Sequence, residues 1–234
     1  MFEAQPRAKP PVSARADDEG VRLLDLLLPP ACAGCGAAGS LLCAGCRRVL
    51  RPPSDARDRI VAPDAGVVVG DALLAALAAF TYEGPMRRAL AALKYTGASR
   101  LAPVLAELTL PALDRLVQIT GPAALVPIPI HRDRLASRGY NQAALLAGAL
   151  ARRRRLRVVD ALDRVLPTTK QHRLNRAARL ANLRGAFAAS GRAPHVAILV
   201  DDIITTTATL EACASVLRDA GCGAVYGFGV AREV

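Results

Sequence analysis

The chain of 234 residues has room for one ordinary domain and a small accessory module, and its 52% hydrophobic content is enough for a core. Aromatic residues make up only 3% and Trp is absent, which argues against stacking of nucleobases on aromatic side chains as the main mode of binding. The net charge of +11 is concentrated, because residues 85–192 carry 20 Lys and Arg against 5 Asp and Glu. This segment has either a solvated basic face or an anionic partner: a phosphorylated small molecule, nucleic acid or an acidic protein.

The first 20 residues mix Pro, Arg and acids and lack the apolar centre of a signal peptide, so we expect a disordered tail at 1–20. No stretch approaches the ~18–20 apolar residues of a membrane span. Residues 21–28 form a short apolar run that predicts a two-turn helix ending at Pro29. The clustered cysteines that follow suit a reducing compartment, and we expect the protein to be cytoplasmic.

Four of the six cysteines form two C-x2-C pairs, Cys32 with Cys35 and Cys43 with Cys46. Two such pairs complete a tetrahedral set of four thiolates, which favours Zn²⁺. All four positions are filled, so the metal is expected to be structural, in a compact module over 21–50. An iron–sulfur cluster and two disulfides are the alternatives. The remaining Cys213 and Cys222 are expected to be buried thiols.

The next segments combine linker and helix signals. Residues 51–84 are interpreted as linker and accessory chain, although the apolar stretch 66–82 fits a strand or a helix. Pro85 suits the first turn of a helix that runs to about Lys94. Residues 101–108 continue with helical character, and Pro111 is expected to interrupt them.

From residue 124 onward the pattern alternates between strands and helices. Strands are predicted over 124–130, at 158–159, over 196–200 and over 224–230, and helices over 140–153 and 207–220. The segment 166–187 is basic and has no clear strand character. The alternation predicts an α/β domain over 85–234, with a parallel sheet flanked by helices.

The strand at 196–200 leads into two adjacent acids, Asp201 and Asp202, and then into Thr205, Thr206, Thr207, Ala208 and Thr209. The carboxyl end of a parallel strand is a common ligand position, and a helix N-terminus offers N–H groups to a phosphate. The acids are suited to ribose hydroxyls, or to Mg²⁺ through water. The alternative is that acids and threonines only cap a turn and a helix.

This strand, acid pair and threonine-rich loop resemble the phosphoribosyl pyrophosphate (PRPP) motif of type I phosphoribosyltransferases. Further blocks narrow the resemblance to the ComF family, phosphoribosyltransferase-like proteins associated with bacterial DNA uptake and competence. These blocks are the cysteine cluster, Phe80–Pro85, Leu93–Tyr95, Val126–Gln142, Thr168–Gln171, Arg179, Asn182 and Arg184–Phe187. The chain departs from the family at Thr207, where glycine is usual and lets the backbone approach a phosphate.

The resemblance implies a type I phosphoribosyltransferase-like fold that binds PRPP with Mg²⁺. Catalytic and Mg²⁺-binding roles would fall to Asp201 and Asp202, with PRPP on the loop from Thr205 to Thr209. Pyrophosphate would meet His131 and Arg132 and a basic lid containing Lys170, Arg173 and Arg179.

The implied activity is phosphoribosyl transfer to an unknown acceptor. The alternative is a non-catalytic scaffold of the DNA-uptake machinery that binds PRPP or nucleic acid, with single-stranded DNA or DNA-uptake proteins as partners. The roles of three residues stay open. Lys94 could lie at the edge of the site or neutralise the end of its helix. Asn141 and Gln142 could bind ligand or cap a helix. The sequence does not predict an oligomeric state.

Overall fold

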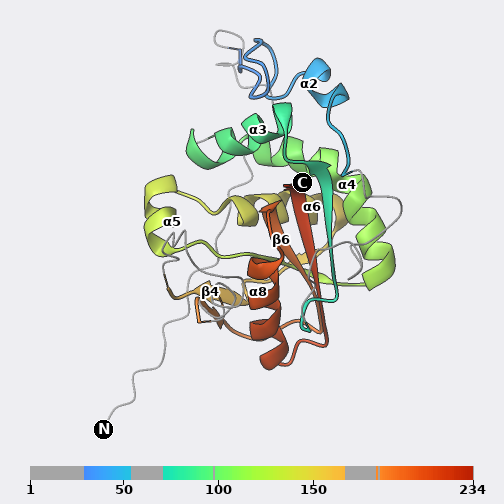
Figure 1. Cartoon of the computed structure of the whole chain (residues 1–234), viewed down its shortest axis with the longest axis vertical. Coiled ribbons are helices and arrows are strands. Elements are labelled where there is room, and N and C mark those ends of the chain that lie inside the picture. Colours follow the sequence, from blue (N-terminus) through green and yellow to red (C-terminus); the bar gives the residue numbers. More distant parts are fainter. Residues whose placement is uncertain (1–28, 54–70, 97, 167–182, 184, 234) are drawn as a thin grey trace.

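Five parallel strands form a central sheet in the order β1-β7-β6-β2-β3. Figure 1 shows the whole chain, with β6 labelled near its centre. The strands are β1 (Ala75–Thr81), β2 (Ala124–Pro127), β3 (Arg157–Val158), β6 (Val196–Ile204) and β7 (Ala224–Arg232). The computed structural model describes residues 29–53, 71–96, 98–166, 183 and 185–233. The predicted tail at 1–20, the helix at 21–28 and the lid residues Lys170, Arg173 and Arg179 lie outside these residues.

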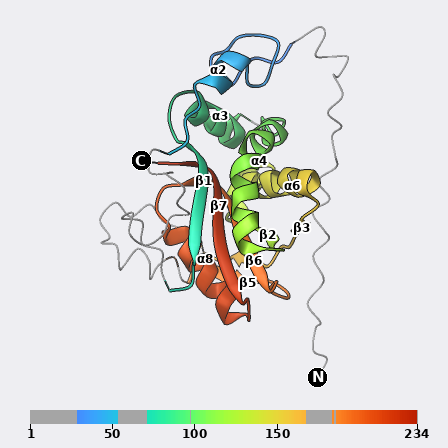
Figure 2. The ribbon, with the colours of Figure 1, turned by 90° about the vertical axis from the view of Figure 1, so that its right-hand side faces the viewer.

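Helices cover both faces of the sheet and create two cores (Figure 2). One face packs against α3 (Gly84–Tyr95), α4 (Leu101–Thr120) and α6 (Gln142–Arg154). The other packs against α8 (Ala208–Asp219) and an antiparallel hairpin of β4 (Leu162–Arg164) and β5 (Phe187–Ala189). Because the inner strands are buried on both faces, Val196–Val200 is an unbroken apolar run and not an alternating one.

The four-cysteine module lies on α3 and includes the short helix α2 (Ala44–Arg48) (Figures 1 and 2). Leu42, Cys32 and Cys46 are buried in the same apolar cluster as Met86 and Leu90 of α3. The predicted fold class, a parallel sheet flanked by helices with a small N-terminal cysteine module, is confirmed. Among the described helices, none has both the length and the apolarity to cross a bilayer.

Several predicted elements differ from the observed ones. The interruption at Pro111 is wrong, because α4 continues through it to Thr120. Buried Leu105, Ala106, Leu113 and Leu116 lie at helical spacing on both sides of the proline, and their packing outweighs the lost hydrogen bond.

The apolar stretch 66–82 contains a strand, β1, which pairs with β7 at the edge of the sheet. This strand lies within the segment 51–84 that we interpreted as linker and accessory chain. The hairpin β4–β5 and the short helix α5 (Arg132–Arg138) were not predicted. These elements are only three to seven residues long, and α5 has no buried residue, so hydrophobic periodicity carries no signal for them.

Candidate functional site

The sheet has a topological switch point between β6 and β2. From β6 the chain continues through α8, on one face, to its neighbour β7, whereas from β2 it continues through α6, on the other face, to β3. Connections that leave on opposite faces open a crevice at the carboxyl ends of the two strands, where open α/β sheets bind ligands. The segment 128–131 begins beside Asp201, because Pro127 pairs with Val200, and the threonine-rich loop begins where β6 ends at Ile204.

Both acids lie inside β6 and not after it, because pairing with β7 continues to Ile204 and Arg232. Asp202 is 2% exposed. Its Oδ2 lies 2.7 Å from Nζ of Lys94, in the last turn of α3, and its Oδ1 accepts a hydrogen bond from Nε2 of Gln142 at 3.3 Å. A cation and an amide from two different helices therefore hold this carboxylate.

Asp201 has a different environment, although it is the adjacent residue. It is partly exposed, and its Oδ1 accepts a hydrogen bond from the backbone N–H of Asp202 at 2.8 Å. Burial, followed by the charge of Asp202, raises the pKa of Asp201 well above its ordinary value, and Lys94 counteracts this rise. The two acids therefore differ in burial and in hydrogen-bond and ion-pair partners.

The loop after β6 leads into α8 with Thr207 as the N-cap residue. Thr205 and Thr206 are exposed, whereas Thr207 is 5% exposed and has φ −70° and ψ −1°. This conformation suits a β-branched residue, so the loop forms without the positive φ that glycine would permit. Ala208 and Thr209 begin α8, so that the N-terminus of this 12-residue helix, with its N–H groups, follows the C-terminal end of β6.

On the β2 side, His131 and Arg132 have different positions. His131 is buried and caps α5, because its Nδ1 accepts the N–H of Asp133 at 3.4 Å. The Arg132 side chain is 90% exposed. Asn141 caps α6 by accepting the N–H of Ala143 at 2.9 Å, and it donates to the carbonyl of Ile128 at 3.0 Å. Asn141 thus ties α6 to the segment that follows β2.

The four cysteines form a second site, apart from the acids. Their sulfur atoms all lie within 4.8 Å of one another, and the Cys32–Cys46 and Cys35–Cys43 pairs are each 3.7 Å apart. Zn–S bonds of about 2.3 Å in a tetrahedron would place sulfurs about 3.8 Å apart, so the cluster fits structural zinc. Within the described residues no other group of three or more His, Cys, Asp or Glu side chains is arranged for a metal.

Backbone hydrogen bonds prepare the cysteines for a metal. The N–H of Cys43 donates to Sγ of Cys32 at 3.2 Å, and the N–H of Cys46 donates to Sγ of Cys43 at 3.4 Å. Burial opposes ionisation of Cys32, but N–H donors from Cys43, Cys35 and Gly34 lower its pKa to about 6. Burial and the neighbouring thiols raise the pKa of Cys46 to about 12, which a bound cation would reverse.

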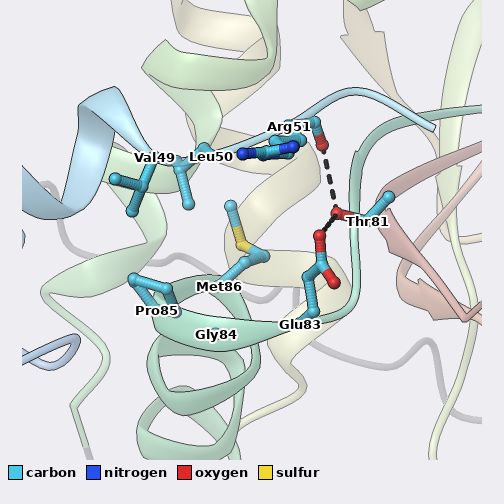
Figure 3. Close-up of a pocket in the computed structure, with 8 residues that line it drawn as sticks. All are labelled: Val49, Leu50, Arg51, Thr81, Glu83, Gly84, Pro85 and Met86. Carbon is cyan, nitrogen blue, oxygen red and sulfur yellow. Dashed lines mark hydrogen bonds between the residues drawn. The ribbon is translucent and has the colours of Figure 1, made fainter. Parts of the chain in front are cut away.

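A small cavity of about 210 Å³ lies between the cysteine module, the end of β1 and the first turn of α3 (Figure 3). Two hydrogen bonds cross its wall: the Thr81 hydroxyl donates to Glu83 at 2.9 Å and to the carbonyl of Arg51 at 3.3 Å. None of the described residues predicted for the site lines it. The residues that line it are Val49, Leu50, Arg51, Thr81, Glu83, Gly84, Pro85 and Met86.

Two charged groups near the acids were not among the predicted site residues. The sequence left open whether Lys94 lies at the edge of the site or at the end of its helix. In the structure it lies in the last turn of α3 and is also paired with Asp202. Arg164 lies on the unpredicted strand β4. Burial, followed by the charge of Arg134, lowers the pKa of Arg164, and the charge of Asp201 acts in the opposite direction. The sequence carried a signal for Lys94, one of three lysines, but none for Arg164.

The chain is similar to known proteins over about half to two thirds of its length, and no family model matches it. Competence protein F of Haemophilus influenzae is 35% identical over 123 residues, which are 50% of this chain and 54% of that protein. DNA utilization protein YhgH of Escherichia coli K12 is 32% identical over 152 residues, 62% of this chain and 66% of that protein. Competence protein ComFC of Streptococcus pneumoniae is 30% identical over 156 residues, 66% of this chain and 67% of that protein. The matched region thus spans from about half to two thirds of these relatives.

Proposed function

Because the chain belongs to the ComF family of competence proteins, we propose that it acts in DNA uptake by binding PRPP with Mg²⁺ at the switch point between β6 and β2. The observation that supports this proposal is that Asp201, in the C-terminal half of β6, lies beside the start of the segment 128–131 and is followed by the 205–209 loop and α8. The N-terminus of α8 and two exposed threonine hydroxyls suit a phosphate, and Asp201 suits a ribose hydroxyl.

Mg²⁺ would be bound chiefly through the ligand. Asp202 is buried and held by Lys94, and the described acids do not form a metal cluster by themselves. Mg²⁺ commonly keeps several waters and is held by one or two carboxylates together with substrate phosphates. Asp201, which is partly exposed, is the carboxylate that would complete such a set.

We further propose that the protein is a phosphoribosyltransferase. In this reaction a nucleophilic acceptor would form a bond to the anomeric carbon of PRPP, and the bond from that carbon to pyrophosphate would break, with its electron pair leaving on pyrophosphate. Stabilisation of the leaving charge would come from basic side chains such as exposed Arg132. Positioning would supply most of the catalysis.

Charge favours a second candidate, a scaffold that binds single-stranded DNA. Arg132 and Arg134 are exposed on α5, within the basic segment 85–192. Contacts with phosphates release counterions, so such binding weakens steeply with salt. Salt-sensitive binding of single-stranded DNA that survives Asp201→Ala would favour this candidate, whereas pyrophosphate release that requires Asp201 would favour the transferase.

Calorimetric titration of the zinc-loaded protein with PRPP, with and without Mg²⁺, tests the proposed site. We expect Mg²⁺-dependent binding that disappears in the double variant Asp201→Asn/Asp202→Asn, which removes both negative charges at little change in volume. Urea unfolding of the same samples checks that the variant is folded. The absence of binding heat in the unmodified protein under every condition would refute PRPP binding and leave the DNA-binding scaffold.

A further inference from the structure

Lys94 and Asp202 form an ion pair that is largely removed from solvent. The Nζ–Oδ2 distance is 2.7 Å, and the side chains are 19% and 3% exposed. The pair between Arg154 and Asp114, by contrast, has side chains that are 36% and 40% exposed. Charges that leave water are stabilised only if partners with good geometry replace the solvent, so the Lys94–Asp202 pair depends on its surroundings.

The surrounding residues hold both partners in place. The hydroxyl of Tyr140 donates to the carbonyl of Leu93 at 2.5 Å, which fixes the last turn of α3 next to Lys94. Gln142 donates to the second oxygen of Asp202, and Arg138 donates to the amide oxygen of Gln142. The amide of Gln142 is thereby oriented with its nitrogen towards Asp202, and the pair is part of a continuous polar network that joins α3, α6 and β6.

The charge of this pair matters for any anion at the switch point. Two adjacent carboxylates beside a helix N-terminus would repel phosphate groups and cancel the attraction of the helix. The helix that carries Lys94, α3, and the helix that follows the threonine loop, α8, lie on opposite faces of the sheet. Lys94 therefore compensates the charge of Asp202 from the face opposite to α8. Of the two adjacent acids, Asp201 is then the one that is partly exposed and not paired with Lys94.

We propose that Lys94 is a positioning residue of the PRPP site: its pairing with Asp202 neutralises one of the two adjacent acids, so that a polyphosphate can bind beside Asp201. This inference rests on the proposed function. It separates the two acids, since Asp201 meets the ligand or its Mg²⁺, whereas Asp202 is buried and its charge is compensated by Lys94.

The test compares PRPP affinity, measured by calorimetry with Mg²⁺, across a set of variants. We expect Lys94→Met to bind PRPP about tenfold or more weakly, Lys94→Arg to stay within about threefold of the unmodified protein, and Lys94→Met/Asp202→Asn to recover most of the loss. Recovery is expected because the second substitution removes the charge that the first one exposed. Arg154→Met, which breaks the exposed pair on α6, is the matched control and should leave the affinity unchanged.

Urea unfolding accompanies each titration, so that affinities are compared only among folded variants. If Lys94→Met does not fold, Asp202→Asn and the double variant replace it. The proposal expects these two to bind within about threefold of each other, because the lysine has no task once the carboxylate is neutral. A much weaker double variant would overturn the positioning role and indicate direct contact of Lys94 with the ligand.

The outcomes separate this inference from the proposed function. Lys94→Met that binds PRPP as tightly as the unmodified protein overturns the role of Lys94 and leaves PRPP binding intact. An unmodified protein that binds no PRPP overturns both.

Discussion

At the scale of single residues, Gly34 is where the cysteine module tolerates no side chain. A Cβ at this position would lie 2.6 Å from Sγ of Cys46 and 3.0 Å from Cβ of Pro85. Neither neighbour is the end of a flexible chain, since one is a metal ligand and the other belongs to the proline ring at the start of α3. The absence of a side chain at Gly34 therefore lets the turn that carries Cys32 and Cys35 pack closely against both Cys46 and the start of α3.

We expect Gly34→Ala to weaken zinc binding about tenfold or more, because overpacking costs about 1–3 kcal/mol and 1.4 kcal/mol is a factor of ten. Competition with a zinc chelator measures this affinity. Gly45→Ala is the matched control, since its Cβ would meet only Sγ of Cys43, at 3.8 Å. Equal losses in the two variants would show that the tight contact at Gly34 is not the cause.

At the scale of elements, α4 contains two prolines in unlike positions. Pro103 lies in the first turn of this 20-residue helix, where the backbone N–H has no partner within the helix. Pro111 lies in the middle and is exposed, where a proline removes one hydrogen bond and crowds the preceding turn. The helix persists because Leu105, Leu113 and Leu116 are fully buried against the sheet and its neighbours.

Replacing Pro111 should therefore stabilise the protein. We expect Pro111→Ala to raise the free energy of unfolding by about 1–2 kcal/mol, less than the ~3 kcal/mol cost of an interior proline because the unfolded chain also gains freedom. Urea unfolding measures the change. Pro103→Ala should be neutral or slightly destabilising. A stabilisation of the same size at both positions would contradict the hydrogen-bond explanation.

At the scale of the whole molecule, α3 connects the two sites. Its first turn contacts the cysteine module, where Arg88 donates to the carbonyl of Gly34 and Pro85 lies under the first cysteine turn. Its last turn carries Lys94, which is paired with Asp202 in the sheet. One helix of 12 residues thus has a metal module at one end and the acidic pair at the other.

Removal of zinc should loosen this helix. Two of the three described hydrophobic residues that the module buries are cysteines of the cluster, Cys32 and Cys46, so without the metal it should open, and α3 should lose its contacts with Gly34. Hydrogen exchange before and after chelation is the measurement. We expect the amides of α3 to exchange about tenfold faster or more, while those of α8, on the far face, stay unchanged. Faster exchange confined to the module, with α3 unaffected, would contradict this coupling.

The sequence by itself determined the features that depend on local pattern. Cysteine spacing predicted the four-ligand cluster, and the long apolar runs predicted the inner strands, because burial on both faces leaves a continuous signal. The parallel sheet followed from the alternation of these strands with helices. The position of the threonine loop between a strand and a helix also came from the pattern, although the extension of β6 through Asp201 and Asp202 to Ile204 did not.

Only the tertiary structure decided how distant residues meet. Along the chain, 48 residues separate Lys94 from Gln142, and 60 separate Gln142 from Asp202. Packing of α3 and α6 on one face of the sheet brings these three side chains together. The same applies to Arg164 near Asp201 and to the persistence of α4 through Pro111. Pairing, burial and charge compensation arise between elements, so no local pattern contains them.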